Sequence, residues 1–183
     1  MKLRIISGEL KGRRIKAPDS NLIRPTTDRV KETLFNLLSN RIDFDGIKVL
    51  DVYAGSGSLG FECISRGAAS VDFVEKNYVI YRNLEENIND LDLAGKCRIF
   101  KMDALRFSGL YNDVGYNLIL ADPPFFKDDI YKVVLNLVAN KYLTADGSII
   151  IERSIQTRNE DELNLNVKPF KIIGDACLYE ITY

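Results

Sequence analysis

Short apolar segments of strand length recur along the chain and alternate with segments that are predicted to be helical. The predicted strands are residues 47–52, 71–75, 97–102, 116–121 and 148–152. The predicted helices between them are residues 59–65, 78–91 and 130–140. A final antiparallel pair is predicted at residues 170–173 and 178–182. Strands that alternate with helices favour an α/β fold with a mostly parallel sheet, helices on both faces and, here, an antiparallel C-terminal strand.

The start of the chain carries additional elements. Residues 3–7 and 13–16 are predicted to form a short hairpin, with glycines for the turn between them. Residues 26–38 then place apolar side chains at the spacing of an amphipathic helix. We therefore expect residues 1–45 to be an N-terminal extension, made of a hairpin and a helix, and residues 46–183 to be the main domain.

Composition is that of an ordinary globular protein and narrows the possible chemistry. Apolar residues make up 46% of the chain, and their runs are too short to cross a bilayer. The first residues turn polar too early for a signal peptide, so a cytoplasmic location is expected. The chain has no histidine, which excludes Ser-His and Cys-His pairs and removes the commonest metal ligand. Cys63, Cys97 and Cys177 have neither the spacing of a zinc site nor that of a disulfide framework.

The positive charge of the chain is concentrated at its start. Residues 1–41 contain ten Lys and Arg against four Asp and Glu, a net charge of +6, whereas the whole chain has a net charge of −1. A basic head on an acidic body suits the binding of a polyanion through the head. A basic surface without a ligand explains the charge equally well, so charge alone leaves both interpretations open.

A glycine-rich turn follows the strand at residues 47–52. Its sequence, Gly55-Ser56-Gly57-Ser58-Leu59-Gly60, fits the GxGxxG pattern between a strand and a helix. Glycines let the backbone turn tightly and approach a ligand closely. Glu75 closes the next strand and can accept hydrogen bonds from both hydroxyls of a ribose. These residues together predict a nucleoside-containing cofactor at the carboxyl edge of the sheet.

Two further carboxylates at the same edge bear on the identity of this cofactor. Asp51 stands just before the glycine turn, where it would repel a pyrophosphate and attract the ammonium group of S-adenosylmethionine. It therefore favours S-adenosylmethionine over a dinucleotide. Asp103 ends the third strand, where it could accept a hydrogen bond from the adenine amino group or cap the next helix. The sequence leaves these two roles open.

The tetrapeptide Asp122-Pro123-Pro124-Phe125 follows the fourth strand. Its prolines fix the backbone and lack N–H groups, which leaves carbonyl oxygens to accept hydrogen bonds from a ligand. The Asp122 carboxylate and the Pro123 carbonyl could hold the two hydrogens of an exocyclic amino group and aim its nitrogen at a methyl group. Phe125 offers a face for stacking of the base, which must be unpaired or flipped out of its helix. The motif predicts methylation of a base amino nitrogen, without a metal ion.

These motifs and the N-terminal segment resemble the RsmD-type ribosomal RNA methyltransferases of bacteria. The resemblance covers almost the whole chain, and its most specific part is residues 24–36. It implies a Rossmann-like class I S-adenosylmethionine-dependent methyltransferase fold. It also implies methylation of the N2 amino group of a guanine in small-subunit (16S) rRNA. The chain departs from the family pattern at Tyr53, Met102 and Arg153, where phenylalanine, glycine and histidine are usual.

The resemblance assigns roles to particular residues. It implies that S-adenosylmethionine is bound by Asp51, Ala54, Gly55, Ser56, Gly57, Glu75, Asp103 and Ala104. It implies that the amino group is positioned by Asp122, Pro123, Pro124 and Phe125. It implies RNA contacts by Arg4, Lys11, Arg13, Arg14, Arg24 and Arg29. The expected partner is small-subunit rRNA within an assembling ribosomal particle, with the protein acting as a monomer and away from membranes.

Three other functions stay open at this point. An adenine amino (N6) methyltransferase acting on DNA or RNA would use the same tetrapeptide. A nicotinamide-dependent oxidoreductase would use the same glycine turn, but would explain neither the tetrapeptide nor the basic head. A non-catalytic RNA-binding module would keep the fold, and the intact tetrapeptide argues against it. Methylation of a cytosine carbon is disfavoured, because none of the cysteines lies in a comparable loop.

Overall fold

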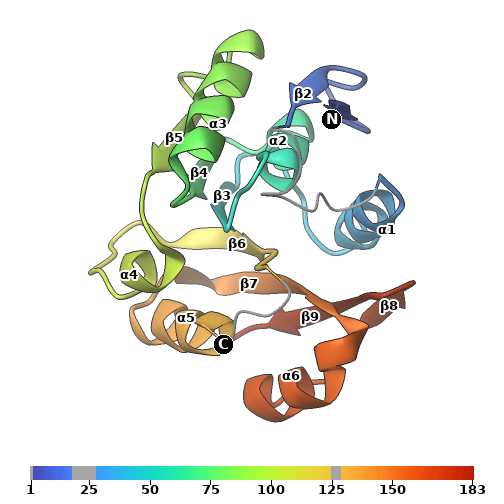
Figure 1. Ribbon diagram of the computed structural model, residues 1–183, viewed down its shortest axis with the longest axis vertical. Helices are drawn as coiled ribbons and strands as arrows, with labels where there is room; N and C mark the ends of the chain where they lie inside the picture. Colours follow the sequence, from blue (N-terminus) through green and yellow to red (C-terminus); the bar gives the residue numbers. More distant parts are fainter. Residues whose placement is uncertain (1, 18–27, 125–128) are drawn as a thin grey trace.

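The computed structural model describes residues 2–17, 28–124 and 129–183, and these residues form two β-sheets. The larger sheet has the strand order β5-β4-β3-β6-β7-β9-β8 (Figure 1). Its strands are β3 (Lys48–Val52), β4 (Ser70–Val74), β5 (Cys97–Phe100), β6 (Tyr116–Ala121), β7 (Leu143–Ser154), β8 (Lys171–Ile173) and β9 (Ala176–Ile181). The neighbouring strands β5, β4, β3, β6 and β7 are parallel to one another, whereas β9 runs antiparallel to both β7 and β8. The predicted sheet is confirmed.

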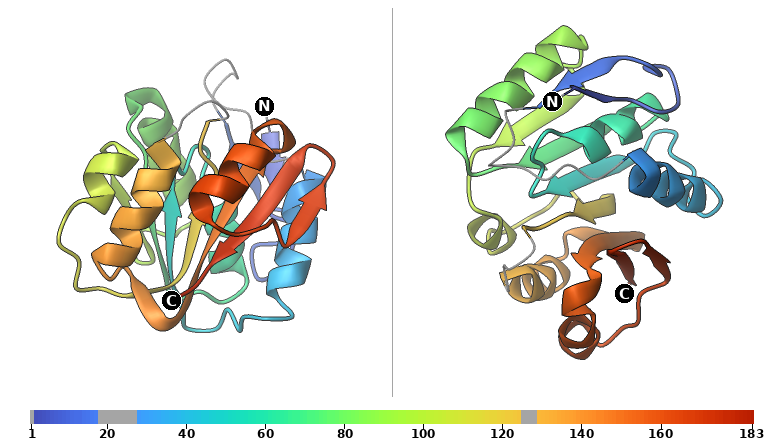
Figure 2. Two further views of the ribbon diagram at one scale, coloured as in Figure 1. Left: turned by 90° about the horizontal axis from the view of Figure 1, so that it is seen from below. Right: turned by 45° about the vertical axis from the view of Figure 1, so that its right-hand side comes forward.

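Helices cover both faces of this sheet (Figures 1 and 2). One face carries α1 (Asp28–Leu38), α2 (Ser58–Ser65) and α3 (Tyr78–Asp90), and the other carries α4 (Ala104–Ser108) and α5 (Asp129–Ala139). Successive side chains of a strand point to opposite faces. In β3, Val49 therefore packs under the first group of helices and Leu50 under the second. Both faces of β3 are buried, as expected for a parallel sheet with an apolar run of residues.

β1 (Lys2–Arg4) and β2 (Arg14–Lys16) form the predicted antiparallel hairpin, which lies against α2 and α3 (Figure 2). Leu3 and Ile15 are buried in the same core as α1 and α2. The turn approaches α2 so closely that a Cβ on Gly8 would lie 1.6 Å from the Ser65 carbonyl oxygen, so glycine is required there. The N-terminal elements thus share a core with the main sheet, and a domain boundary near residue 45 stays a prediction.

A buried ion pair joins α1, α2 and the hairpin. The side chains of Lys31 in α1 and Glu62 in α2 are fully buried, and Lys31 Nζ lies 3.5 Å from Glu62 Oε1. The same ammonium group donates to the Arg4 carbonyl at 2.7 Å and to Ser58 Oγ at 3.0 Å. Glu62 also accepts a hydrogen bond from Arg66 Nη1 at 2.6 Å. Both charges are therefore paired and hydrogen-bonded inside the core, as buried ions require.

Several elements differ from the sequence-based expectation. The residues of α6 (Arg158–Leu165) are mostly polar and Asp161 is their buried member, so no apolar period predicts this helix. α4 is too short to show a period. β7 begins at Leu143, before the predicted start at residue 148. The first part of this strand contains half-buried and exposed residues, so the sequence does not show a strand pattern there. Among the described helices, none is both long and apolar enough to cross a membrane.

Candidate active site

Four carboxylates lie at the carboxyl ends of four neighbouring strands. Asp51 belongs to the end of β3, and Glu75, Asp103 and Asp122 follow β4, β5 and β6. β3 pairs in register with β4 and β6 up to the last residue of each strand. Because parallel strands that end together place their following residues at one edge, the four side chains gather there. The structure thus places these carboxylates at the edge where the sequence predicts the cofactor and substrate.

The glycine turn connects β3 to α2 at this edge. Ala54 and Ser56 are buried, and Gly55 and Gly57 have positive φ angles of 54° and 77°. A Cβ on Gly57 would lie 2.6 Å from a methyl carbon of Leu84 in α3 and from a ring carbon of Phe61, so a side chain here would displace its neighbours and would also be strained by the positive φ. This close packing fixes the path of the backbone beside the four carboxylates.

Asp51 is the most buried of the four carboxylates, at 2% exposure. Its Oδ2 accepts a hydrogen bond from the N–H of Gly60 at 3.0 Å. Burial raises the pKa of Asp51 well above its usual value; the hydrogen bond from Gly60 opposes this shift, and the negative charges of Asp122 and Glu75 add to it. A cation bound at this edge would offset the repulsion between these carboxylates. The site therefore favours a ligand that carries positive charge.

The carboxylate of Glu75 is held in one orientation by the backbone. Its Oε1 accepts from the N–H of Asn77 at 2.7 Å, and its Oε2 accepts from the N–H of Gly55 at 3.2 Å. Asn77 in turn caps α3 with its side chain. Each oxygen of a carboxylate can accept more than one hydrogen bond. Both oxygens of Glu75 can therefore still accept from the hydroxyls of a ligand.

Asp103 takes the capping role that the sequence leaves open. Its Oδ1 accepts from the N–H of Leu105 at 3.0 Å and caps α4. Its Oδ2 lies 3.6 Å from Lys76 Nζ, and both of these side chains are partly exposed. Ala104, the first residue of α4, is buried. A ligand can still reach this carboxylate, and its contact with an adenine stays a prediction.

The segment Asp122-Pro123-Pro124 leaves the sheet at the end of β6. Asp122 is half-buried, Pro123 is buried and Pro124 is exposed. Ala121, which precedes Asp122, pairs with Val52, which follows Asp51, and the charge of Asp122 contributes to the raised pKa of Asp51. Phe125, the predicted stacking residue, lies outside the described residues. The structure therefore places the first three residues of the tetrapeptide beside the cofactor candidates, and the role of Phe125 stays a prediction.

Hydrogen bonds near α5 and α6 join residues that the sequence analysis does not assign to the site. Tyr53 donates to Asp129 Oδ1 at 3.1 Å, which links the end of β3 to the first turn of α5. Tyr131 and Arg153 Nε both donate to Asp161 Oδ1, each at 2.8 Å. Arg153 lies near the end of β7 and is 2% exposed. Its sequence signal is a basic residue after an apolar strand, where RsmD-type proteins usually have histidine.

The basic residues of the head lie on the surface. Those that the structure describes are all exposed: Arg4, Lys11, Arg13, Arg14 and Arg29. Arg4 and Arg14 stand directly opposite each other in the β1–β2 ladder. Like charges in this position repel each other, and an anion bound between them would offset this repulsion. Arg24 lies outside the described residues.

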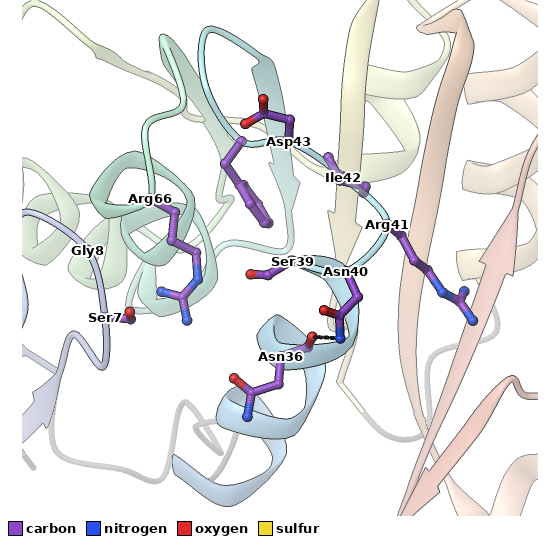
Figure 3. A pocket seen from close by; sticks show the side chains of 10 residues that line it. Ser7, Gly8, Asn36, Ser39, Asn40, Arg41, Ile42, Asp43 and Arg66 are labelled. Atoms are coloured by element: carbon purple, nitrogen blue, oxygen red, sulfur yellow. Dashed lines mark hydrogen bonds between the residues drawn. The ribbon is translucent and has the colours of Figure 1, made fainter.

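A polar pocket of about 650 Å³ lies at the opposite, amino edge of the sheet (Figure 3). It is bounded by the hairpin turn, the end of α1 and the segment before β3. Arg66 and Ser39 point into it, whereas Arg41 points away and pairs with Glu180 at 2.9 Å. Because the pocket residues precede β3 and β4, this pocket is separate from the four carboxylates at the carboxyl edge.

Comparison with known proteins places the chain in a family. A family model described as "Conserved hypothetical protein 95" matches residues 3–180. The chain belongs to this family, the RsmD family. This RsmD-family chain is 37% identical over 153 residues to "Putative rRNA methyltransferase YlbH" of Bacillus subtilis, with 82% of each protein covered. It is 36% identical over 154 residues to "Ribosomal RNA small subunit methyltransferase D" of Escherichia coli K12, with 84% of this chain and 76% of the relative covered.

Solved structures share the fold of the RsmD-family chain. The structure described as "Putative methyltransferase yhhF from Escherichia coli" matches with a TM-score of 0.81 and 30% identity. The match covers 100% of this chain and 99% of the other chain. The structure of a ribosomal protein L11 methylase from Lactobacillus delbrueckii matches with a TM-score of 0.67 and 21% identity, over 86% of this chain and 80% of the other chain. This likeness concerns the fold alone. The class I methyltransferase fold expected from the sequence is confirmed.

Proposed function

We propose that the RsmD-family chain transfers a methyl group from S-adenosylmethionine to the exocyclic N2 amino group of a guanine in small-subunit rRNA. The observation that carries this proposal is the position of Asp122 and Pro123, which leave β6 at the edge shared with the glycine turn and Glu75. Acceptors for a base amino group therefore lie beside residues suited to the cofactor. The relatives named as rRNA methyltransferases support rRNA as the substrate.

The described residues fit S-adenosylmethionine better than a dinucleotide. Asp51 is buried among further carboxylates, an arrangement that favours a cation and repels a pyrophosphate. Glu75 offers two oriented oxygens for ribose hydroxyls, and the turn at residues 54–57 lets a ligand approach the backbone. Asp103 and Ala104 would border the adenine at the start of α4. When bound, S-adenosylmethionine supplies the electrophilic methyl group.

Asp122 and Pro123 position the nucleophile in this proposal. The lone pair of a base amino group is delocalised into the ring, so the nitrogen is a weak nucleophile unless it is well oriented. The Asp122 carboxylate and the Pro123 carbonyl would accept its two hydrogens and align the nitrogen with the methyl group. The negative charge of Asp122 would also stabilise the positive charge that develops on the nitrogen. Phe125 would stack on the base.

The exposed cations of the head would hold the RNA. We assign phosphate contacts to Arg4, Lys11, Arg13, Arg14, Arg24 and Arg29. Contacts of this kind bind RNA without reading its sequence. They position the strand, while the residues around Asp122 select the base. We propose that the rRNA is presented in an assembling ribosomal particle and that the protein acts as a monomer.

The test is methyl transfer from labelled S-adenosylmethionine to small ribosomal subunits and to naked 16S rRNA from a strain that lacks the enzyme. The RNA is then digested to nucleosides and analysed by mass spectrometry. Label in N2-methylguanosine is expected, and the better of the two substrates identifies the substrate form. Label in N6-methyladenosine would overturn the target base. Absence of label in RNA, with S-adenosylmethionine bound, would overturn the RNA substrate.

A further inference from the structure

Arg153 is a buried cation at the carboxyl edge of the sheet, where the candidate active site lies. It is 2% exposed and lies near the carboxyl end of β7. In the sheet, Ile151 of β7 pairs with Ala121, the last residue of β6. Arg153 stands two residues beyond this pair in β7, at the same edge of the sheet where the segment Asp122-Pro123 leaves β6.

Asp161 fixes one side of the Arg153 guanidinium. Arg153 Nε donates to Asp161 Oδ1 at 2.8 Å, and Asp161 is fully buried. Asp161 also accepts from the Tyr131 hydroxyl at 2.8 Å and from Thr157 Oγ1 at 2.7 Å. Burial acts to lower the pKa of Arg153, but the hydrogen bond and the charge of Asp161, with a further contribution from Tyr131, outweigh it, so the pKa is raised and the guanidinium is charged. The orientation of this charged group is set by α5 and α6.

The other two guanidinium nitrogens, Nη1 and Nη2, have no hydrogen-bond partner within the described part of the chain. Both are shielded from solvent. Buried donors of a charged group that lack a partner are costly and rare in native proteins. A ligand with two adjacent acceptors would satisfy them, because the guanidinium holds its donors in a rigid, planar fork.

We infer that Arg153 reads the target base by donating from Nη1 and Nη2 to O6 and N7 of guanine. The inference rests on the proposed function and explains the choice of base. Guanine presents O6 and N7 as neighbouring acceptors, and arginine pairs with both at once. Adenine carries an amino group in place of O6, so that donor would face donor. The fork therefore favours guanine and leaves the N2 amino group for Asp122 and Pro123.

Binding of the base must uncover the two nitrogens. The ring of Tyr131 lies over the guanidinium, with its centroid 5.8 Å from Arg153 Cζ. Tyr131 is half-buried in the first turn of α5. Changes of side-chain rotamer are common where a partner binds. Tyr131 is the described side chain that we expect to move when the base enters.

The test uses 16S rRNA into which a synthetic fragment is ligated at the nucleotide methylated by the wild-type protein, and the RNA is presented naked or in small subunits, whichever form the wild-type protein prefers. At that position the fragment carries guanine, 2,6-diaminopurine or 7-deazaguanine. 2,6-Diaminopurine keeps the N2 amino group but replaces O6 with an amino group, and 7-deazaguanine lacks N7. Wild type is expected to methylate guanine with a kcat/KM about tenfold or more above that for 2,6-diaminopurine, the range of discrimination by a bidentate arginine.

Arg153→Met is expected to reduce the ratio of kcat/KM for guanine to kcat/KM for 2,6-diaminopurine to about threefold or less, with unchanged affinity for S-adenosylmethionine. Arg153→Lys keeps the charge beside Asp161 but loses the fork, so it should also lose discrimination. The matched control is Arg158→Met, which removes a partly exposed arginine of α6 and should keep the wild-type ratio.

Retention of the wild-type ratio by the Arg153 variants would overturn the inference, even with reduced turnover. A merely structural role would lower methylation of all three bases equally. If Arg153→Met fails to fold, the ratio measured with Arg153→Lys decides. Failure of the wild-type protein to methylate any guanine in both small subunits and naked 16S rRNA would overturn the proposed function itself, and this result is obtained before a variant is made.

Discussion

The buried pair of Lys31 and Glu62 gives the sharpest prediction about stability. Glu62→Gln keeps the size of the side chain and a carbonyl oxygen, but removes the negative charge. Lys31 Nζ, fully buried and 3.5 Å from Glu62 Oε1, then loses this counter-charge. Its hydrogen bonds to the Arg4 carbonyl and to Ser58 Oγ stay in place but do not replace the charge.

The expected cost follows from burial. Removing one partner of a buried ion pair destabilises a protein by about 3–5 kcal/mol, because the remaining ion stays desolvated. For a domain of this size, that corresponds to a decrease in melting temperature of about 6–20 °C. Lys31→Met should cost less, because Glu62 keeps its hydrogen bond to Arg66 at 2.6 Å. The double variant should cost less than the sum of the two single variants.

Urea unfolding of wild type, both single variants and the double variant, followed by circular dichroism, measures these free energies. Glu85→Gln is the matched control, because Glu85 forms a partly exposed pair with Arg82 and should contribute below about 1 kcal/mol. A Glu62→Gln variant within about 1 kcal/mol of wild type would refute the reasoning, as would additive effects in the double variant.

Three further predictions concern the site. Asp122→Ala should leave S-adenosylmethionine affinity nearly unchanged in calorimetry and lower turnover by about a hundredfold or more, and equal turnover would contradict its role. Because the pKa of Asp51 is raised, its ionised form becomes abundant only as the pH rises through that pKa, so the affinity for the cationic cofactor should increase with pH. Asp51→Asn should make this affinity less dependent on pH, and an unchanged pH dependence in the variant would contradict the assignment. Arg4→Gln combined with Arg14→Gln should reduce the slope of log affinity for rRNA against log salt by about 1.5, whereas Arg82→Gln on α3 should not, and equal slopes would argue against the hairpin as the RNA surface.

The carboxyl edge of the sheet is predictable because its chemistry is local in sequence. The glycine turn follows β3 directly, and Glu75 and Asp122 stand at the ends of apolar strands. Parallel strands bring such residues together without further information. The sequence cannot show that Asp103 caps α4 through Oδ1, because a cap and a ligand contact require the same side chain.

The parts that sequence reasoning misses depend on contacts between distant segments. Lys31 lies in a helix whose period suggests an ordinary amphipathic face, and its burial follows from Glu62 and the hairpin. Asp161 lies in a polar helix without an apolar period, yet it is fully buried against Arg153. A charged residue is expected at the surface unless its partner is known. Only the folded chain supplies that partner.

The central claim is that the RsmD-family chain methylates the N2 amino group of a guanine in small-subunit rRNA. Its most direct test compares the nucleosides of 16S rRNA from cells with and without the gene, by liquid chromatography and mass spectrometry. The account predicts that deletion removes N2-methylguanosine from one position, and that wild type restores it while Asp122→Ala does not. An N2-methylguanosine content that is unchanged by the deletion would contradict the claim.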